Sequence, residues 1–494
     1  MGTKTPLMRI GGLISGFLLA ASLIFLATSG SLAARQNLPQ IGEPADAALS
    51  PATEREIGKN FMRQIRASVP VVRDIQIAEY LDAMGARLSA NVADSDTHEF
   101  TFFIIENPTI NAFAIPGGYI GLNSGLIEAM NVEDQLAAVI GHEIAHITQR
   151  HHARSVASSG RSRLTTAAAI LAAIIIGQSS PQAAQAALAA GIAASQQSLI
   201  NFTRSNEYEA DRIGIEILAQ ASYQPEAMAE AFEILRRKNN LNIGANHLEY
   251  LRTHPLDNIR IAEAKNRAAA LKHDKRIDTQ VEFAIFKARN RVLTTKDKGQ
   301  LERNYRATQT SPVLASRVEA TYALTMLDLD KRRFDKALQK IEPLLEKYPD
   351  NLNLQLLASR AWFRAGQTEK SAERLELLTK VYPQNYSVVN MQIEHYIEAR
   401  RPEQAHAVLR SYLRSNNTAN SFAWRDLANI EQQRGNESAS HEALARFFTE
   451  LNELGRARAQ LVLALRETNS GTTDALRLNA RLRELDSEIK RYNK

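Results

Sequence analysis

The carboxyl-terminal half of the chain repeats itself every 34 residues, and this period constrains the fold more than any other feature of the sequence. Tyr348-Pro349 recurs as Tyr382-Pro383, and the same offset joins Trp362 to Tyr396. It also joins a series of small residues: Ala337, Ser371, Ala405 and Ala439. A small residue inside one helix lets a neighbouring helix approach closely, and a proline ends the second helix of a pair. The period therefore predicts a stack of helix pairs.

Thirty-four residues is the period of tetratricopeptide repeats, and we expect about four of them between residues 317 and 455. Capping helices before and after would complete a domain over residues 300–494. Asn417 stands where the third unit should have a proline, and the fourth unit matches less well. A generic helical bundle is the alternative. A solenoid of this kind binds proteins or peptides on its concave face and is not expected to catalyse a reaction.

The amino terminus predicts export. Lys4 and Arg9 precede an uncharged apolar run over residues 10–27, and Ser31-Leu32-Ala33 offers the small residues that signal peptidases prefer. Residues 1–34 are therefore expected to be a signal peptide, with cleavage after residue 33 or 34. An uncleaved membrane anchor is the alternative, because the apolar run approaches the roughly 20 residues that span a bilayer.

Residues 48–275 have the mixed pattern of a second domain. Apolar residues recur at helical spacing over residues 54–66, 75–88 and 133–150, whereas 100–105 and 112–122 are rich in β-branched and aromatic residues. We expect helices packed around a small sheet. An alanine-rich segment over 165–200 predicts two short helices that form a packed hairpin, with a membrane contact, a substrate contact or a lid as alternatives.

A HExxH motif at residues 142–146 predicts a metal-binding catalytic site. Positions four apart share one face of a helix, so His142 and His146 can bind the same Zn²⁺, and Glu143 can reach water at that metal. The chain has no cysteine, so a metal must be held by histidine and carboxylate. We expect one zinc per chain.

A catalytic zinc needs a third protein ligand. Glu207 and Asp211 are the strongest candidates, because they share a helix face: the first can bind metal while the second holds the outer nitrogen of a ligating histidine. Glu209 should point away as a solvated carboxylate. The other candidates are His98, His247 and His254, together with His151 and His152, which follow the motif too closely on one helix to fold back.

These motifs resemble the M48 zinc metallopeptidases, a gluzincin family that includes the CAAX prenyl proteases. The resemblance covers roughly residues 50–270 and rests on HEIAH at 142–146, NEYEAD at 206–211, NAFAIPGGYI at 111–120, and His254-Pro255 followed by Arg260. It implies a gluzincin-type α+β domain in which His142, His146 and Glu207 bind zinc and Glu143 is the general base. It also implies that Asp211 is a proton donor, whereas its spacing predicts a positioning role.

Two further elements have open roles. Asn111, Ala112 and Phe113 begin an extended stretch suited to be an edge strand against which substrate backbone pairs, although a core strand is the alternative. His254 could be an oxyanion donor, a fourth zinc ligand that silences the enzyme, or a buried structural histidine.

The function expected from these features is that of an exported zinc endopeptidase. With an export signal and terminal repeats, the chain is similar to the periplasmic branch of M48, which implies stalled or misfolded outer-membrane proteins as substrates and docking on their assembly machinery through the repeats. The alternatives are an adaptor or chaperone with a latent protease site, and membrane-embedded prenyl-protein processing, which the lack of convincing spans disfavours. The net charge of +6 is scattered, so nucleic acid is not expected, while a pI of 9.3 permits peripheral attraction to anionic membranes.

Overall fold

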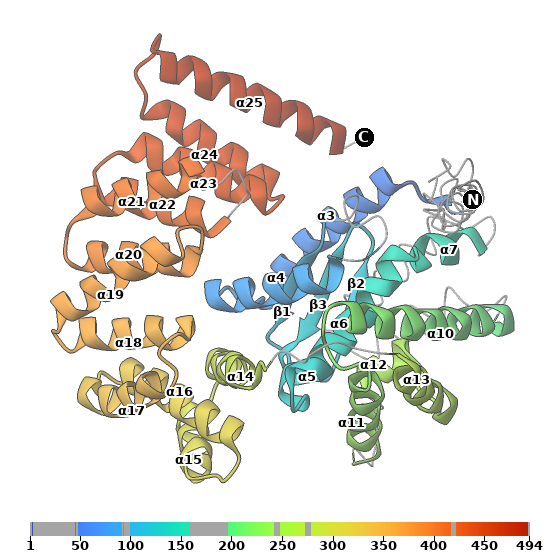
Figure 1. Ribbon diagram of the computed structural model, residues 1–494. Helices are drawn as coiled ribbons and strands as arrows, with labels where there is room; N and C mark the ends of the chain where they lie inside the picture. The colour runs from blue at the N-terminus through green and yellow to red at the C-terminus, as the bar shows by residue number, and fades with distance from the viewer. Residues whose placement is uncertain are drawn as a thin grey trace.

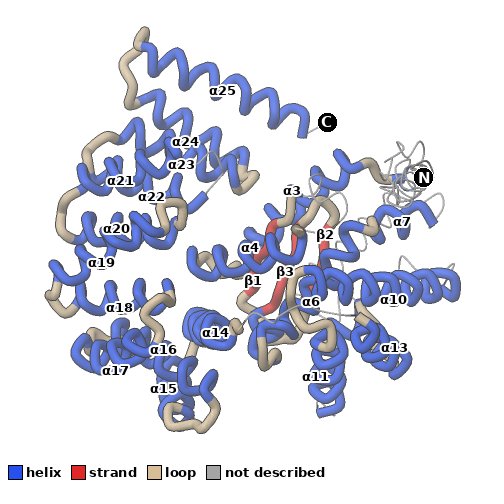
Figure 2. The backbone as a smooth tube through the Cα atoms, viewed as in Figure 1, coloured by secondary structure: helices blue, strands red, loops and turns tan. Residues whose placement is uncertain are grey.

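A computed structural model describes residues 48–90, 99–158, 196–241, 248–271, 278–415 and 421–492, together with Gly2, Ala45 and Val92. The described chain is mainly helical with one small sheet, as expected (Figures 1 and 2). The expected signal peptide at 1–34 and residues 165–195 of the alanine-rich segment lie outside the described residues. Among the residues that the structure does describe, no helix combines the length and apolar composition needed to cross a bilayer.

The first part of the chain packs helices around a three-stranded sheet of order β1-β3-β2 (Figure 2). Strand β1 runs parallel to β3, and β2 forms an antiparallel hairpin with β3 through Pro116-Gly117-Gly118. Both glycines have positive φ, 87° and 92°, which explains their use at this turn. The elements are α3 (Pro51–Ser68), α4 (Ile75–Ser89), β1 (Thr101–Ile105), β2 (Ala112–Ile115), β3 (Tyr119–Asn123), α5 (Ser124–Ala129), α6 (Glu133–Thr148), α7 (His151–Ser158), α10 (Gln196–Gln220), α11 (Ala227–Leu241), α12 (Glu249–Thr253) and α13 (Asn258–Ala270).

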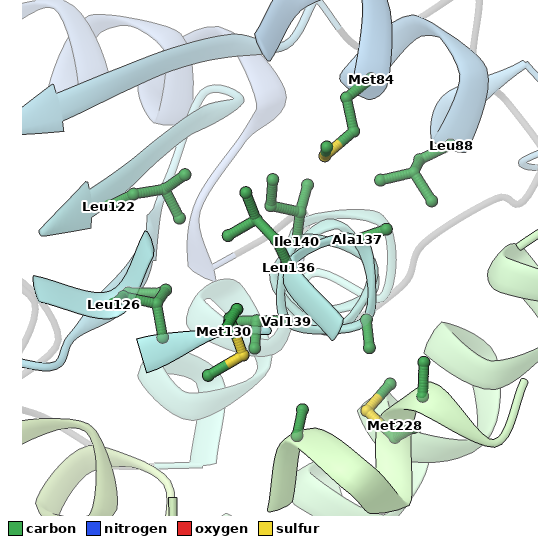
Figure 3. Packing of buried hydrophobic residues seen from close by; sticks show 14 of the residues in the cluster. Met84, Leu88, Leu122, Leu126, Met130, Leu136, Ala137, Val139, Ile140 and Met228 are labelled. Atoms are coloured by element: carbon green, nitrogen blue, oxygen red, sulfur yellow. The ribbon is translucent and has the colours of Figure 1, made fainter. Parts of the chain in front are cut away.

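Helix α6 is the central element of this domain. Every residue from Glu133 to Ile147 is buried, so the helix is enclosed on all sides. Figure 3 views the helix nearly end-on, with Met84 and Leu88 of α4 on one side, Leu122 of β3 on another and Met228 of α11 opposite. A helix packed in this way cannot tilt or slide without opening the core. Side chains on α6 are therefore held at fixed positions.

The second part is an array of antiparallel helix pairs that curves beside α4 (Figure 1). Two helices precede the expected repeats, four pairs form them, and two helices follow. In order they are α14 (Gln280–Thr294), α15 (Lys298–Thr308), α16 (Leu314–Asp330), α17 (Phe334–Lys347), α18 (Leu352–Arg364), α19 (Thr368–Val381), α20 (Tyr386–Glu398), α21 (Pro402–Ser415), α22 (Ser421–Gln433), α23 (Glu437–Glu450), α24 (Leu454–Arg466) and α25 (Thr473–Tyr492).

The expectation that Ala439 continues the series of small residues is wrong by one position, because Ser440 takes that place in the structure. Ser371 is fully buried and donates its hydroxyl to the carbonyl of Ser359, 12 residues earlier, at 2.8 Å. Ser440 makes the equivalent bond to the carbonyl of Ala428, also 12 residues earlier and at 2.8 Å. Ala439 is only half-buried. The chain gains one residue between α21 and α22, so a strict 34-residue offset fails at this point.

The repeat array is fastened to the first domain. Helix α14 places Phe283 and Phe286 in the core of the first domain and Ala284, Ile285 and Ala288 in the core of the repeats. Arg289 of α14 donates two 2.7 Å hydrogen bonds to the carboxylate of Asp74, which also caps the first turn of α4. Farther along the array, Glu79 of α4 accepts the backbone N–H of Tyr386 at 2.7 Å. Helix α4 and its N-cap thus contact the repeat array at two separate points, Asp74 and Glu79.

We expect Arg289→Met to lower the free energy of unfolding by about 3 kcal/mol, because it leaves the largely buried Asp74 carboxylate, whose side chain is 14% exposed, without its cation. Equilibrium denaturation with urea measures the change. Arg237→Met on the exposed face of α11 is the matched control and should stay within about 0.5 kcal/mol of the unmodified protein. Equal losses in the two variants would contradict a stabilising role for the Arg289–Asp74 pair.

Candidate metal centre

The centre depends on a close crossing of α6 and α10. A Cβ atom added at Gly214 of α10 would lie 3.2 Å from the backbone nitrogen of His142 and 2.8 Å from Cε of Met228. On the facing helix, a Cβ added at Gly141 would lie 3.4 Å from the carbonyl oxygen of Gly214. Gly214 therefore lies where the two backbones are too close for a larger side chain, and Gly141 faces it. The preceding turns of α10 bring Glu207 opposite the two motif histidines.

Four buried side chains, His142, His146, Glu207 and His254, direct donor atoms to one point and lie within 4.8 Å of one another. Nε2 of His142 lies 3.0 Å from Nε2 of His146 and 3.4 Å from Oε2 of Glu207. Nε2 of His146 lies 3.4 Å from Oε1 of Glu207. Ligands about 2.0–2.1 Å from a tetrahedral metal are about 3.3–3.4 Å apart. The separations of these donors therefore suit one four-coordinate ion.

His254 occupies the fourth corner of this group. It follows the short helix α12, and its Nδ1 lies 3.3 Å from Nε2 of His142 and 3.0 Å from Oε1 of Glu207. The ring stacks on Tyr250, with centroids 4.7 Å apart. Its other nitrogen, Nε2, is 3.6 Å from Oε1 of Glu143. The same histidine thus reaches both the donor group and the expected general base.

Asp211 lies behind His142, on the side away from the other donors. Its Oδ1 is 3.0 Å from Nδ1 of His142, within hydrogen-bonding distance. Arg260 donates two 2.7 Å bonds to the same carboxylate, and its Nη1 lies 3.0 Å from Oε2 of Glu207. Burial disfavours the charge on Asp211, but the Arg260 guanidinium and His142 together outweigh burial and lower the pKa of this carboxyl. Asp211 is therefore held as a carboxylate.

Glu143 has a different environment. Its side chain is fully buried, and neither carboxylate oxygen makes a hydrogen bond of good geometry with the described residues. Burial raises the pKa of Glu143, although His254 and His142 oppose the shift. A carboxyl whose pKa is raised toward neutrality is a stronger base than an ordinary glutamate once it is ionised.

Strand β2 forms an edge of the sheet next to these groups. Ala112 and Phe113 lie in this strand, which pairs with β3 on one side only, and Asn111 directly precedes it. Asn111 accepts the backbone N–H of Asn123 in β3, so the backbone groups of Ala112 and Ala114 face the outer edge. The carbonyl of Ala114 already contacts Nε2 of His152 at 3.1 Å. Among the described strands, β2 therefore lies at the edge of the sheet, although its side chains are buried.

Comparison with known proteins agrees with this architecture. A model of peptidase family M48 matches residues 76–268, and a tetratricopeptide-repeat model matches residues 328–392. The beta-barrel assembly-enhancing protease of Escherichia coli K12 is 31% identical over 484 residues, which are 96% of this chain and 98% of that protein. The chain belongs to peptidase family M48. The predicted metallopeptidase with terminal tetratricopeptide repeats is thereby confirmed.

Other M48 relatives differ in how much of the chain they match. The beta-barrel assembly-enhancing protease of Yersinia pestis is 31% identical over 493 residues, 98% of this chain and 100% of that protein. The mitochondrial metalloendopeptidase OMA1 of Schizosaccharomyces pombe is 33% identical over 154 residues, 31% of this chain and 42% of that protein.

Two expectations about the M48 domain are wrong. His151 and His152 do not continue α6, because the chain turns at Gln149 and Arg150 and starts the separate helix α7. His151 folds back, and its Nδ1 lies 2.8 Å from Nδ1 of His146. Glu209 is not simply solvated, since its Oε2 lies 3.2 Å from Nε2 of His151 and accepts a 2.8 Å bond from Arg154. Among the other proposed ligands, His98 and His247 lie outside the described residues.

The roles of Arg260 and Tyr250 in the M48 centre were not foreseen. Arg260 was noted only as part of a motif, yet it joins the carboxylates of Glu207 and Asp211. Tyr250 is buried with a hydroxyl that has no hydrogen-bond partner among the described residues, and it stacks on His254. For Arg260, the only signal in the sequence is its spacing after His254-Pro255. No sequence pattern indicates a role for Tyr250.

We expect Gly214→Val to weaken metal binding by roughly tenfold or more, because overpacking at the crossing separates Glu207 from the histidines. Metal content after dialysis against a chelator measures the loss, with circular dichroism to verify that helical content is kept. Gly455→Val is the matched control, since an added Cβ there meets nothing within 4 Å. Metal retention equal to that of the unmodified protein in both variants would contradict the proposed role of this crossing.

Proposed function

We propose that this M48 metallopeptidase is a zinc-dependent endopeptidase of the periplasm that acts on stalled or misfolded outer-membrane β-barrel proteins. The name of its full-length relatives, beta-barrel assembly-enhancing protease, supports the substrate class. The proposed boundaries are a signal peptide at 1–34, a protease domain at 48–275 and a repeat domain at 300–494. The observation that carries the proposal is the convergence of His142, His146 and Glu207 beside the buried Glu143.

Zinc fits these residues better than magnesium or calcium does. Imidazole nitrogens and a single carboxylate form the donor set, and the spacing of the donors suits tetrahedral coordination. Magnesium and calcium prefer six or more oxygen ligands. Bound zinc would supply Lewis acidity to a water molecule and to the scissile carbonyl. His142, His146 and Glu207 would hold it.

Glu143 is proposed as the general base. It stands beside the first ligand on α6, and its burial excludes competing solvent. It would accept a proton from the attacking water and pass it to the leaving amine. The raised pKa of this carboxyl suits such a shuttle, because the proton must be both taken and returned.

Asp211 is proposed to position His142, not to donate a proton. A proton donor must be protonated at working pH, whereas the two bonds from Arg260 favour the charged carboxylate. A carboxylate behind a ligating histidine fixes both the ring orientation and the tautomer. The same guanidinium lies against Glu207, so Arg260 would stiffen two parts of the centre together.

Strand β2 is proposed to hold the substrate backbone. Ala112 presents its N–H and carbonyl on the open side of the strand, next to the helix that carries Glu143. An extended peptide could pair there through main-chain bonds alone, and such pairing reads shape without demanding a particular sequence. This suits a protease whose substrates share an unfolded state.

The position of His254 favours a second candidate, an adaptor or chaperone with a latent protease site. A fourth protein ligand fills the position that water needs, and closed four-ligand sites are typical of structural zinc. We propose that His254 is this fourth ligand and must leave before cleavage begins. The repeats would then contact the assembly machinery or unfolded clients. A cavity of about 1010 Å³ between α3, α4, β1 and the later repeats offers one such surface.

We expect Glu143→Gln to retain one zinc per chain while casein cleavage falls by at least about 100-fold, because the substitution removes the base but none of the ligands. Zinc content and casein degradation are measured on the same samples. Cleavage retained in the variant would contradict the assigned base. Zinc bound without cleavage in the unmodified protein would favour the adaptor.

A further inference from the structure

Among the residues that the structure describes, no carboxylate holds the outer nitrogen of His146. His142 has Asp211 behind it, but Nδ1 of His146 faces Nδ1 of His151 at 2.8 Å. The two rings meet edge to face, with centroids 4.8 Å apart and an interplanar angle of 79°. His151 is only 3% exposed, so water cannot easily replace this contact. The second motif histidine therefore has an imidazole where the first has a carboxylate.

The arrangement permits only one set of tautomers if Nε2 of His146 binds a metal. The proton of that ring must then be on Nδ1 and must point at His151, whose Nδ1 has to accept it. His151 in turn carries its own proton on Nε2, which lies 3.2 Å from Oε2 of Glu209. Arg154 also donates to Oε2 of Glu209, at 2.8 Å, and favours the acceptor form. Each donor in the series His146, His151, Glu209 thus meets an acceptor.

The backbone is shaped to bring His151 to this place. Arg150 has a positive φ of 52°, which is uncommon for a residue other than glycine, and it lies in the two-residue turn between α6 and α7. Its side chain is fixed by Glu54 of α3, with Nε at 3.2 Å and Nη2 at 3.1 Å from Oε2. Unfavourable backbone geometry persists where the surroundings impose it, commonly at functional sites. A continuous helix would have carried His151 away from His146.

We propose that His151 and Glu209 are positioning residues for His146: through the series His146–His151–Glu209 they fix the ring and tautomer with which it binds zinc. Asp211 and Arg260 have the corresponding place behind His142. The inference rests on the proposed zinc site. Beyond the zinc ligands, it assigns roles to two residues, His151 and Glu209, that touch neither metal nor substrate and act only through His146. Outer partners of ligating histidines typically change metal affinity by 10–100-fold when they are removed.

The test compares zinc dissociation constants, measured by competition with a chromophoric chelator, for the full-length chain, four single variants and one double variant. We expect His151→Ala to weaken zinc binding by roughly tenfold or more. His151→Asn should recover part of the loss, because its amide oxygen can accept the proton on His146. Glu209→Gln should weaken binding less than His151→Ala does. Glu216→Gln, an exposed glutamate later on α10, is the matched control and should bind zinc like the unmodified protein.

The double variant His151→Ala with Glu209→Gln separates action through His151 from independent effects. If Glu209 acts through His151, the double variant should bind zinc no more weakly than His151→Ala alone. Thermal unfolding of the metal-free variants controls for a general loss of stability. Unchanged zinc affinity in His151→Ala, or equal losses in the alanine and asparagine variants, would overturn the inference. Failure of the unmodified protein to bind zinc would instead overturn the proposed function.

Discussion

The close crossing of α6 and α10 determines the rest of the centre. Helix α6 supplies His142, Glu143 and His146, and α10 supplies Glu207 and Asp211. Neither helix can form the proposed site alone, because the two histidines of α6 need the carboxylate of Glu207 on α10 as a third ligand. Gly214, which faces Gly141, allows the backbones to approach closely enough for a glutamate side chain to span the gap. The sheet, the repeats, and the residues behind the two histidines, Asp211 and His151, then hold the arrangement of donor atoms that this contact makes possible.

Burial determines how the charged groups of the centre behave. Carboxylates removed from water are costly unless cations or donors compensate them. Glu207 and Asp211 are compensated by Arg260, while Glu143 is left with weaker support and a raised pKa. Similar residues on neighbouring helices thereby acquire different roles: Glu207 suits a ligand, Asp211 a fixed partner, and Glu143 a base. Their surroundings, and not their residue type, make this difference.

The sequence predicted what depends on regular helical spacing. His142 and His146 share one helix face in the structure, as do Glu207 and Asp211, because each pair lies on an uninterrupted helix. The fold-back of His151 was missed because its turn uses Arg150, an arginine in a conformation that glycine usually adopts, and no pattern marks it. Ser440 was missed because one extra residue between α21 and α22 breaks the repeat period. The role of Arg260 depends on contacts 49 residues distant, which local patterns do not report.

We propose that three imidazoles and one carboxylate bind a single zinc ion in the resting protein. X-ray absorption spectroscopy at the zinc edge tests it most directly, because outer-shell scattering from imidazole rings counts the histidine ligands. We expect one zinc per chain with four nitrogen and oxygen neighbours, of which three belong to histidines, and a histidine count that falls to two in His254→Ala. A resting shell with only two histidines, unchanged by that substitution, would contradict it.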